Sequence, residues 1–269
     1  MGRPSITVVG SVNLDLVARV ERLPRAGETV SGGSFERVPG GKGANQAVAC
    51  ARLGAEVRLV CAVGDDGFAE EALPREERLE IEAARVAAPT GVALILVDSA
   101  GENQIVVVPG ANGLLGAVEL RESDAVLCQL EVPDEAVAAA WEQATFFCLN
   151  AAPARPIAVD ADLTVVNRHE LDSLRRRDGL VAVTLGAEGA VLLEDGEEVA
   201  RAEPPPVEAI DGTAAGDAFT ACLLVSVLEG REHEESLRRA CAAGALAASR
   251  FGAQPSLPTA AEVDAILRS

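Results

Sequence analysis

Short apolar runs separated by polar turns recur along the chain, and they alternate with longer amphipathic or Ala-rich segments. Continuous apolar runs at 6–10, 57–63 and 125–130 predict buried strands. Longer periodic segments at 44–53 and 233–250 predict helices, the first of which ends at a glycine. Strands that alternate with helices in this way predict an α/β fold around a mostly parallel sheet.

The same pattern predicts most of the remaining elements. Further strands are expected at 145–149, 163–166, 180–185 and 190–193, and further helices at 133–144, 168–177, 214–229 and 259–267. Thr259 and Glu262 have the spacing of a capping box at the start of the last helix. The charged residues 68–85 predict a solvated helix that Pro74 interrupts.

Two segments do not fit this alternation. Residues 16–38 and 91–108 each contain two short strands with turn residues between them. We expect these strands to form a small separate sheet that covers the ligand-binding crevice as a lid.

One stretch combines a helix start with a carboxylate. Residues 209–219 join a proline-rich loop to a long apolar helix, and the small residues Ala214, Ala215 and Gly216 lie where that helix begins. A helix start presents unpaired N–H groups and a positive dipole end, so small side chains there allow an anion to approach. Asp217, in the first turn, is then placed to accept a proton from a substrate hydroxyl. Asp217 as a merely dipole-stabilising residue is the alternative.

The first predicted strand ends in Ser11-Val12-Asn13-Leu14-Asp15. Because polar and apolar residues alternate, Asn13 and Asp15 share one face at the edge where parallel sheets bind ligands. An amide and a carboxylate together suit the hydroxyls of a sugar, although an ordinary Asx turn would use the same residues.

Only one of the 23 Lys and Arg residues is a lysine, Lys42, and it lies inside the glycine cluster of residues 40–45. The cluster lacks the Ser or Thr of a Walker loop and the spacing of a dinucleotide fingerprint. Its glycines would let Lys42 or Asn45 approach a small polar ligand, whereas drift in an Arg-rich composition is the alternative.

Two further motifs follow later strands. Asn167 and Glu170 are spaced to hold a Mg²⁺-water shell near phosphates, but helix capping explains the pair better, and the two roles are compatible. The hairpin Thr184-Leu185-Gly186-x-x-Gly189 could contact a nucleotide or be a plain turn.

Composition narrows the class of protein. A net charge of -19 argues against nucleic acid or an anionic membrane as a partner. Two histidines and six cysteines without paired spacing argue against a zinc site, and we expect buried free thiols. No signal peptide or membrane-spanning run is seen, so we expect a cytoplasmic protein.

Together these motifs resemble the ribokinase family of ATP-dependent, PfkB-type carbohydrate kinases. The resemblance is carried by Gly10-Ser11-x-Asn13-x-Asp15, by Gly40-Gly41-Lys42-Gly43-Ala44-Asn45-Gln46-Ala47 and by Asp211-Gly212-Thr213-Ala214-Ala215-Gly216-Asp217. It implies a single domain over residues 1–269, a three-layer α/β/α sandwich with a mostly parallel sheet plus a small β-sheet lid. It also implies transfer of a phosphoryl group from MgATP to the 5-hydroxyl of ribose.

The resemblance also implies roles for particular residues. Asp217 would be the base, and residues 214–216 would form the anion hole. The sugar would be held by Asn13, Asp15, Gly41, Lys42, Asn45 and Glu131. ATP would be bordered by Asn167, Thr184, Gly186, Gly189, Ala215, Gly216 and Cys241, and Glu170 would reach Mg²⁺ through water. An activating K⁺ would lie among Asp211, Thr213, Ala247, Arg250, Gly252 and Ser256.

The chain departs from this family in being short. Residues 68–90 and the span between Asn167 and Thr184 are trimmed, and Cys241 stands where His or Asn is frequent near the adenine. We expect these losses to affect stability and nucleotide affinity more than chemistry. Other sugar or nucleoside kinases of the family, or a sugar-binding homologue without catalysis, are the alternatives. Lid strands could also pair between subunits as a homodimer.

Overall fold

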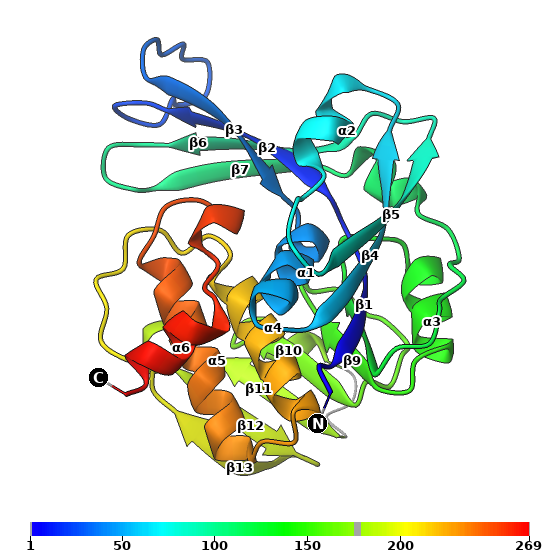
Figure 1. Cartoon of the computed structure of the whole chain (residues 1–269). Coiled ribbons are helices and arrows are strands. Elements are labelled where there is room, and N and C mark those ends of the chain that lie inside the picture. The colour runs from blue at the N-terminus through cyan, green and yellow to red at the C-terminus, as the bar shows by residue number, and fades with distance from the viewer. Residues whose placement is uncertain (1, 175–178, 269) are drawn as a thin grey trace.

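The computed structural model describes residues 2–174 and 179–268 and contains two sheets (Figure 1). The larger has nine strands in the order β13-β12-β11-β10-β9-β8-β1-β4-β5. Their bounds are β1 Ser5–Val9, β4 Glu56–Gly64, β5 Leu79–Val86, β8 Ala125–Gln129, β9 Phe147–Asn150, β10 Leu163–Asn167, β11 Leu180–Thr184, β12 Ala190–Glu194 and β13 Glu197–Ala202. Only β12 and β13 run antiparallel to their neighbours, which confirms the predicted mostly parallel sheet.

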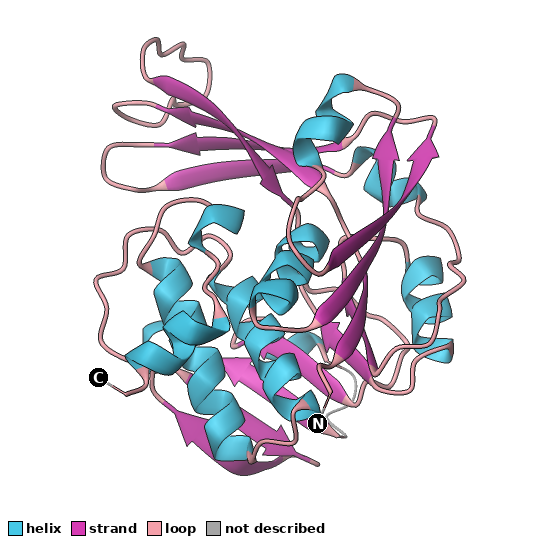
Figure 2. Ribbon diagram, in the orientation of Figure 1, coloured by secondary structure: helices cyan, strands magenta, loops and turns pink. Residues whose placement is uncertain are grey.

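Helices cover both faces of this sheet (Figure 2). One layer contains α1 Lys42–Arg52, α4 Ala215–Leu228, α5 His233–Ala248 and α6 Ala260–Ile266; the other contains α3 Asp134–Glu142 and the 3-10 turn η1 Gly110–Leu114. Adjacent side chains of β1 pack on opposite faces of the sheet: Val8 contacts the core that contains α1, α4 and α5, and Val9 contacts the core that contains α3. This alternation is what a buried parallel strand requires, and the three-layer sandwich is confirmed.

The second sheet confirms the predicted lid. It has the order β3-β2-β6-β7, with β2 Asn13–Arg19, β3 Ser34–Gly40, β6 Gly91–Val97 and β7 Asn103–Val108. In Figure 1 it extends beyond the main body, above α4 and α5. Strand β2 starts at Asn13, directly after β1, so this sheet is anchored where the predicted ligand edge begins.

The prediction for residues 68–85 is wrong in its second half. A short helix, α2 Gly67–Ala72, is followed by strand β5, which pairs in parallel with β4. Leu79, Ile81 and Ala83 pack against the core, while the residues between them are exposed. The charged residues Glu80, Glu82 and Arg85 therefore belong to the solvent-facing side of an edge strand.

The predicted helix 168–177 is also wrong over its described part. After β10 the chain forms turns and a single 3-10 turn, η2 Leu171–Ser173, while residues 175–177 lie outside the described residues. The preceding crossover, residues 151–162, is described throughout and contains no helix.

Two smaller predictions are confirmed. Thr259 and Glu262 form the reciprocal hydrogen bonds of a capping box at α6. All six cysteines are buried free thiols. Among the described residues, no helix is both long and apolar enough to cross a lipid bilayer.

Candidate active site

A polar cavity of about 460 Å³ opens at the carboxyl edge of the nine-stranded sheet, beneath strands β6 and β7. It brings together residues that are far apart in sequence. Every residue predicted to hold the sugar lines it, namely Asn13, Asp15, Gly41, Lys42, Asn45 and Glu131, together with Asp217, Ala214, Gly216, Asn167, Glu170 and Thr184.

Asp217 lies in the first turn of α4, is 6% exposed, and has both carboxylate oxygens hydrogen-bonded. The amide nitrogen of Asn45 donates to Oδ2 at 3.0 Å, and that of Gln46 donates to Oδ1 at 2.8 Å. Burial raises the pKa of Asp217, while Lys42 and these two amides oppose the rise. The carboxylate of Asp217 is thus fixed in orientation, and Lys42 and the two amides limit the rise of its pKa. A general base requires both properties.

The N-terminus of α4 has no side-chain cap. Ala214 occupies the N-cap position with φ 60° and ψ 6°, a left-handed conformation that is costly for a residue with a Cβ. The first helical residues, Ala215 and Gly216, add almost no bulk. The positive end of a helix of 14 residues is therefore open toward the cavity beside Asp217.

Asn13 and Asp15 project from β2 into the cavity. The amide nitrogen of Asn112 donates to Oδ1 of Asn13 at 2.8 Å and so fixes its orientation. Gly40 approaches Asp15 so closely that a Cβ there would lie 2.3 Å from the carboxylate. Burial, with Glu131 and Asp217 nearby, raises the pKa of Asp15 to about 7. The Asp15 carboxyl thus titrates in the physiological range.

Lys42 is the single cationic side chain among the described residues that line this cavity. Asp217 raises its pKa most, burial opposes this, and Glu131 and Glu170 add to the rise. Glu131 is itself fixed by Ser11, whose hydroxyl donates to it at 2.5 Å, and by the Lys42 backbone N–H at 3.1 Å. Buried Oδ1 of Asn45 has no partner in the protein, so it can accept a hydrogen bond from a ligand hydroxyl.

A second cavity, of about 540 Å³, adjoins the first at Thr184, Gly212 and Gly216. Its walls are mainly apolar and carry no charged side chain among the described residues: they include Gly186, Gly189, Pro204, Pro205, Pro206, Ala215, Phe219 and Cys241. The thiol of Cys241 has a pKa raised by burial to about 12, so it remains protonated. An uncharged slot of this size suits a heteroaromatic base, and its meeting point with the polar cavity lies at the α4 N-terminus.

Asn167 and Glu170 make the reciprocal hydrogen bonds expected of the capping pair, but they close a turn, because no α-helix follows over the described residues 168–174. Oδ1 of Asn167 accepts from the N–H of Glu170 at 2.9 Å, and Oε2 of Glu170 accepts from the N–H of Asn167 at 2.8 Å. Both side chains also line the polar cavity. Over residues 2–174 and 179–268, no group of three or more His, Cys, Asp and Glu side chains is arranged as a metal site. A Mg²⁺ ion here would therefore be held through water and phosphate.

The residues predicted for K⁺ lie on two loops that touch. Oδ1 of Asp211 accepts from the N–H and hydroxyl of Thr213, and its Oδ2 accepts from the N–H of Gly252 at 3.0 Å. These hydrogen bonds outweigh burial and lower the pKa of Asp211. Arg250 turns its guanidinium toward Glu262, so only its carbonyl is available to a cation. Ala247 is in the last turn of α5, where its carbonyl accepts from the N–H of Arg250 at 3.1 Å, and the hydroxyl of Ser256 donates to the carbonyl of Ala253 at 2.7 Å.

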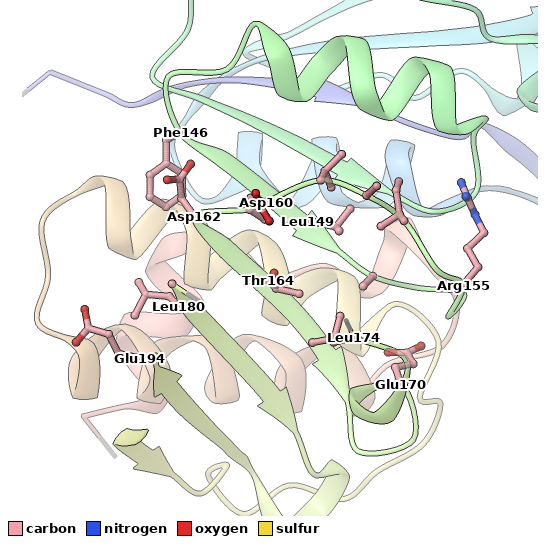
Figure 3. A pocket seen from close by; sticks show the side chains of 16 residues that line it. Phe146, Leu149, Arg155, Asp160, Asp162, Thr164, Glu170, Leu174, Leu180 and Glu194 are labelled. Carbon is pink, nitrogen blue, oxygen red and sulfur yellow. The ribbon is translucent and has the colours of Figure 1, made fainter. Parts of the chain in front are cut away.

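A third cavity, of about 750 Å³, lies over β9, β10 and β11 and is called here the crossover groove (Figure 3). Leu149 and Thr164 form part of its floor, and Leu174 and Leu180 lie along one side. It occupies a face over which the described residues 151–162 and 168–174 place no α-helix. It meets the polar cavity at Glu170.

The fold and the two adjoining cavities define a small-molecule kinase of the α/β class. A family model for pfkB family carbohydrate kinases matches residues 3–260, so the chain belongs to this family.

Relatives of known name agree with this assignment. The chain is 37% identical to a ribokinase of Bacillus subtilis, covering 98% of this chain and 99% of that protein. It is 31% identical to a deoxyribokinase of Salmonella typhi, covering 94% of this chain and 95% of that protein. A structure of Arabidopsis thaliana ribokinase complexed with ribose and ATP superposes with a TM-score of 0.83 at 29% identity, covering all of both chains.

Sequence reasoning missed several polar residues around Asp217 and Asn13. In the sequence, Gln46 stands out only as part of the glycine-rich motif, and no local pattern assigns a role to Gln129, Asn150 or Asn112. Gln129 is the last residue of the otherwise apolar strand β8, and Leu130 follows it, so a polar residue within an apolar run is the signal that could have identified it.

Proposed function

We propose that this chain transfers the γ-phosphoryl group of ATP to the 5-hydroxyl of D-ribose, giving D-ribose 5-phosphate and ADP. The observation that carries the proposal is the position of Asp217. It lies beside an uncapped helix N-terminus at the point where a polar, sugar-sized cavity meets an apolar, base-sized cavity.

The chemistry follows from this arrangement. The 5-hydroxyl oxygen forms a bond to the γ-phosphorus as the bond from that phosphorus to the ADP oxygen breaks. Asp217 accepts the hydroxyl proton, and the α4 N-terminus, with Lys42, stabilises the negative charge on the transferring group. Asn13, Asp15, Asn45, Glu131 and the Gly41 backbone hold the remaining hydroxyls, as their positions around the cavity suggest.

The same proposal includes Mg²⁺ and K⁺ as cofactors and the cytoplasm as the location of the protein. Mg²⁺ would neutralise phosphate charge and be held by Glu170 through water, close to Asn167. K⁺ would be held by the loops of Asp211 and Gly252, where backbone carbonyls rather than a carboxylate cluster supply the ligands. Six buried free thiols support a reducing, cytoplasmic location.

The test is a coupled assay with MgATP over D-ribose, 2-deoxyribose, fructose and adenosine. We expect the highest kcat/KM with D-ribose and a product phosphorylated at the 5-position. The deoxyribokinase relative makes 2-deoxyribose the most informative competitor. Phosphorylation of another substrate with tenfold higher kcat/KM would reassign the chain within the family, and sugar binding without turnover would indicate a non-catalytic homologue.

A homodimer formed through the lid is part of this proposal. Strand β7 is an edge of the small sheet, and four consecutive apolar residues on it are exposed: Ile105, Val106, Val107 and Val108. Ile105 and Val107 line the polar cavity, whereas Val106 and Val108 point to the opposite face. An exposed apolar edge of this kind is suited to pairing with a second copy.

Light scattering should therefore give about twice the chain mass of 27.7 kDa. Val106→Lys, which spares the cavity, should shift the protein toward monomer. A wild-type monomer at micromolar concentration would reject this part of the proposal.

A further inference from the structure

Asp217 is held by a chain of side-chain amides that extends away from the cavity into the core. Gln46, 0% exposed, donates from Nε2 both to Oδ1 of Asp217 at 2.8 Å and to Oδ1 of Asn150 at 2.9 Å. Its own carbonyl oxygen accepts from Nε2 of Gln129 at 2.6 Å. Gln129 is also 0% exposed and neighbours Asn150 across the β8–β9 pair. Neither glutamine lines the cavity.

The direction of this chain is determined by the charge at its end. An ionised carboxylate only accepts hydrogen bonds, so Gln46 must turn its NH₂ group toward Asp217. The Gln46 carbonyl must then face Gln129, and only the NH₂ group of Gln129 can satisfy it. Every amide dipole therefore points its positive end along the path toward the carboxylate, and each bond strengthens the next.

The arrangement has a cost that a purely structural role does not explain. Oε1 of Gln129 is buried and has no hydrogen-bond partner, and Gly10 packs so closely that a Cβ there would lie 2.1 Å from this oxygen. A leucine or methionine would fill a core strand position without an unpaired atom. The side chain of Gln129 instead provides the hydrogen-bond donor for the carbonyl oxygen of Gln46.

We propose that Gln46 and Gln129 are positioning residues for the base of the reaction. Gln46 fixes the carboxylate plane of Asp217 and favours its ionised form, and Gln129 acts only through Gln46. The inference rests on the proposed kinase reaction and adds to it the residues that hold the base ready.

The proposal predicts how the pKa of Asp217 changes when Gln46 or Gln129 is replaced. Burial raises the pKa of Asp217, and hydrogen bonds to the ionised form lower it. Removal of the Gln46 donor must therefore raise that pKa further. Removal of Gln129 must raise it by less, because Gln46 remains but is free to rotate.

The experiment compares wild type, Gln46→Leu, Gln129→Leu and the double variant, with Gln143→Leu as a control on the exposed end of α3. In Gln46→Leu we expect kcat to fall about 10- to 100-fold with the KM for ribose changed less than about threefold. The acid limb of kcat/KM should move up by about one pH unit, a tenfold change in the ionisation equilibrium. Gln129→Leu should show the same changes at smaller size, and the double variant should resemble Gln46→Leu alone.

A second readout does not depend on turnover. The carboxyl carbon of Asp217, identified by its loss in Asp217→Asn, is titrated by ¹³C NMR in each variant. Its apparent pKa should rise in the same order, and Gln143→Leu should leave it unchanged. If Gln46→Leu does not fold, Gln46→Glu keeps the shape and the bond from Gln129 but places a second carboxyl against Asp217, which should raise its pKa further.

Additive effects of the two substitutions, or an unmoved Asp217 titration in folded variants, would overturn the inference. An inactive wild type with the expected shift in the NMR titration would reject the proposed function and leave the amide chain supported. An active wild type whose variants show no shift in the NMR titration would support the proposed function and reject the role of the amide chain.

Discussion

The polar cavity and the crossover groove lie on the same sheet and share Glu170, yet they are built differently. In the polar cavity, side chains from β2, α1 and α4 converge, and the buried Asp217 has both carboxylate oxygens hydrogen-bonded. In the groove, the described residues that lie over the floor of β9 and β10 come from the crossover 151–162 and from the turns at 168–174, which contain no α-helix. Figure 3 shows its charged groups spread around the rim rather than converging.

The contrast between the two cavities separates two requirements of the fold, which are the positioning of reactive groups and the coverage of the sheet. Phosphoryl transfer depends on positioning at the carboxyl edge of the strands and at one helix N-terminus. Coverage of the sheet face contributes buried apolar area and hence stability. The crossovers over the groove bear on the second requirement and the polar cavity on the first, so substitutions in the two regions should affect different measurements.

The largest difference in kcat is expected when one aspartate in each region is replaced by asparagine. Asp217→Asn should lower kcat about 10²- to 10⁴-fold because the base is lost, with ribose affinity largely retained. Asp162→Asn in the groove should leave kcat within about twofold, since an amide oxygen can still accept the bond from the N–H of Phe147. Steady-state kinetics with both variants test this, and near wild-type turnover of Asp217→Asn would remove it from the mechanism.

Asp15→Asn should weaken ribose binding about 10- to 100-fold, because a charged acceptor is lost from the cavity. It should also change the dependence of stability on pH. The pKa of Asp15 is about 7 in the folded protein against an ordinary value of 3.8, so folding favours the protonated form. Wild-type stability should therefore fall as pH rises from about 4 to 7, by up to a few kcal/mol.

The asparagine variant lacks this ionisation. Its Tm should exceed that of wild type above pH 7, and the difference should shrink as pH falls toward 4. Thermal scans at pH 4.5, 6 and 8 would measure the effect. Parallel Tm curves for the two proteins would contradict a raised pKa at Asp15.

The smallest effect on activity is expected from apolar truncations. Leu223→Ala in α4, 0% exposed, should cost about 3–5 kcal/mol of unfolding free energy. Leu149→Ala, on the floor of the groove, should cost closer to about 2 kcal/mol, because part of its surroundings is already empty. Urea unfolding measures both. Leu149→Ala should keep kcat, and equal destabilisation by the two variants would show that the groove is packed as tightly as the core.

What the sequence determined by itself is mostly local. The α4 start, the glycine cluster, the lid hairpins and the cap of α6 are each written in a few consecutive residues, because helix and turn geometry depends on near neighbours. The position of Asp217 in the first turn of α4 was predictable for the same reason.

Only the tertiary structure decided which residues surround that base. Asn45 and Gln46 reach Asp217 across 172 and 171 positions, and Gln129 reaches Gln46 across 83. Likewise β5 became an edge strand, not a helix, because β4 offered it a partner. Contacts of this range depend on how whole elements pack, and no local pattern of polar and apolar residues encodes them.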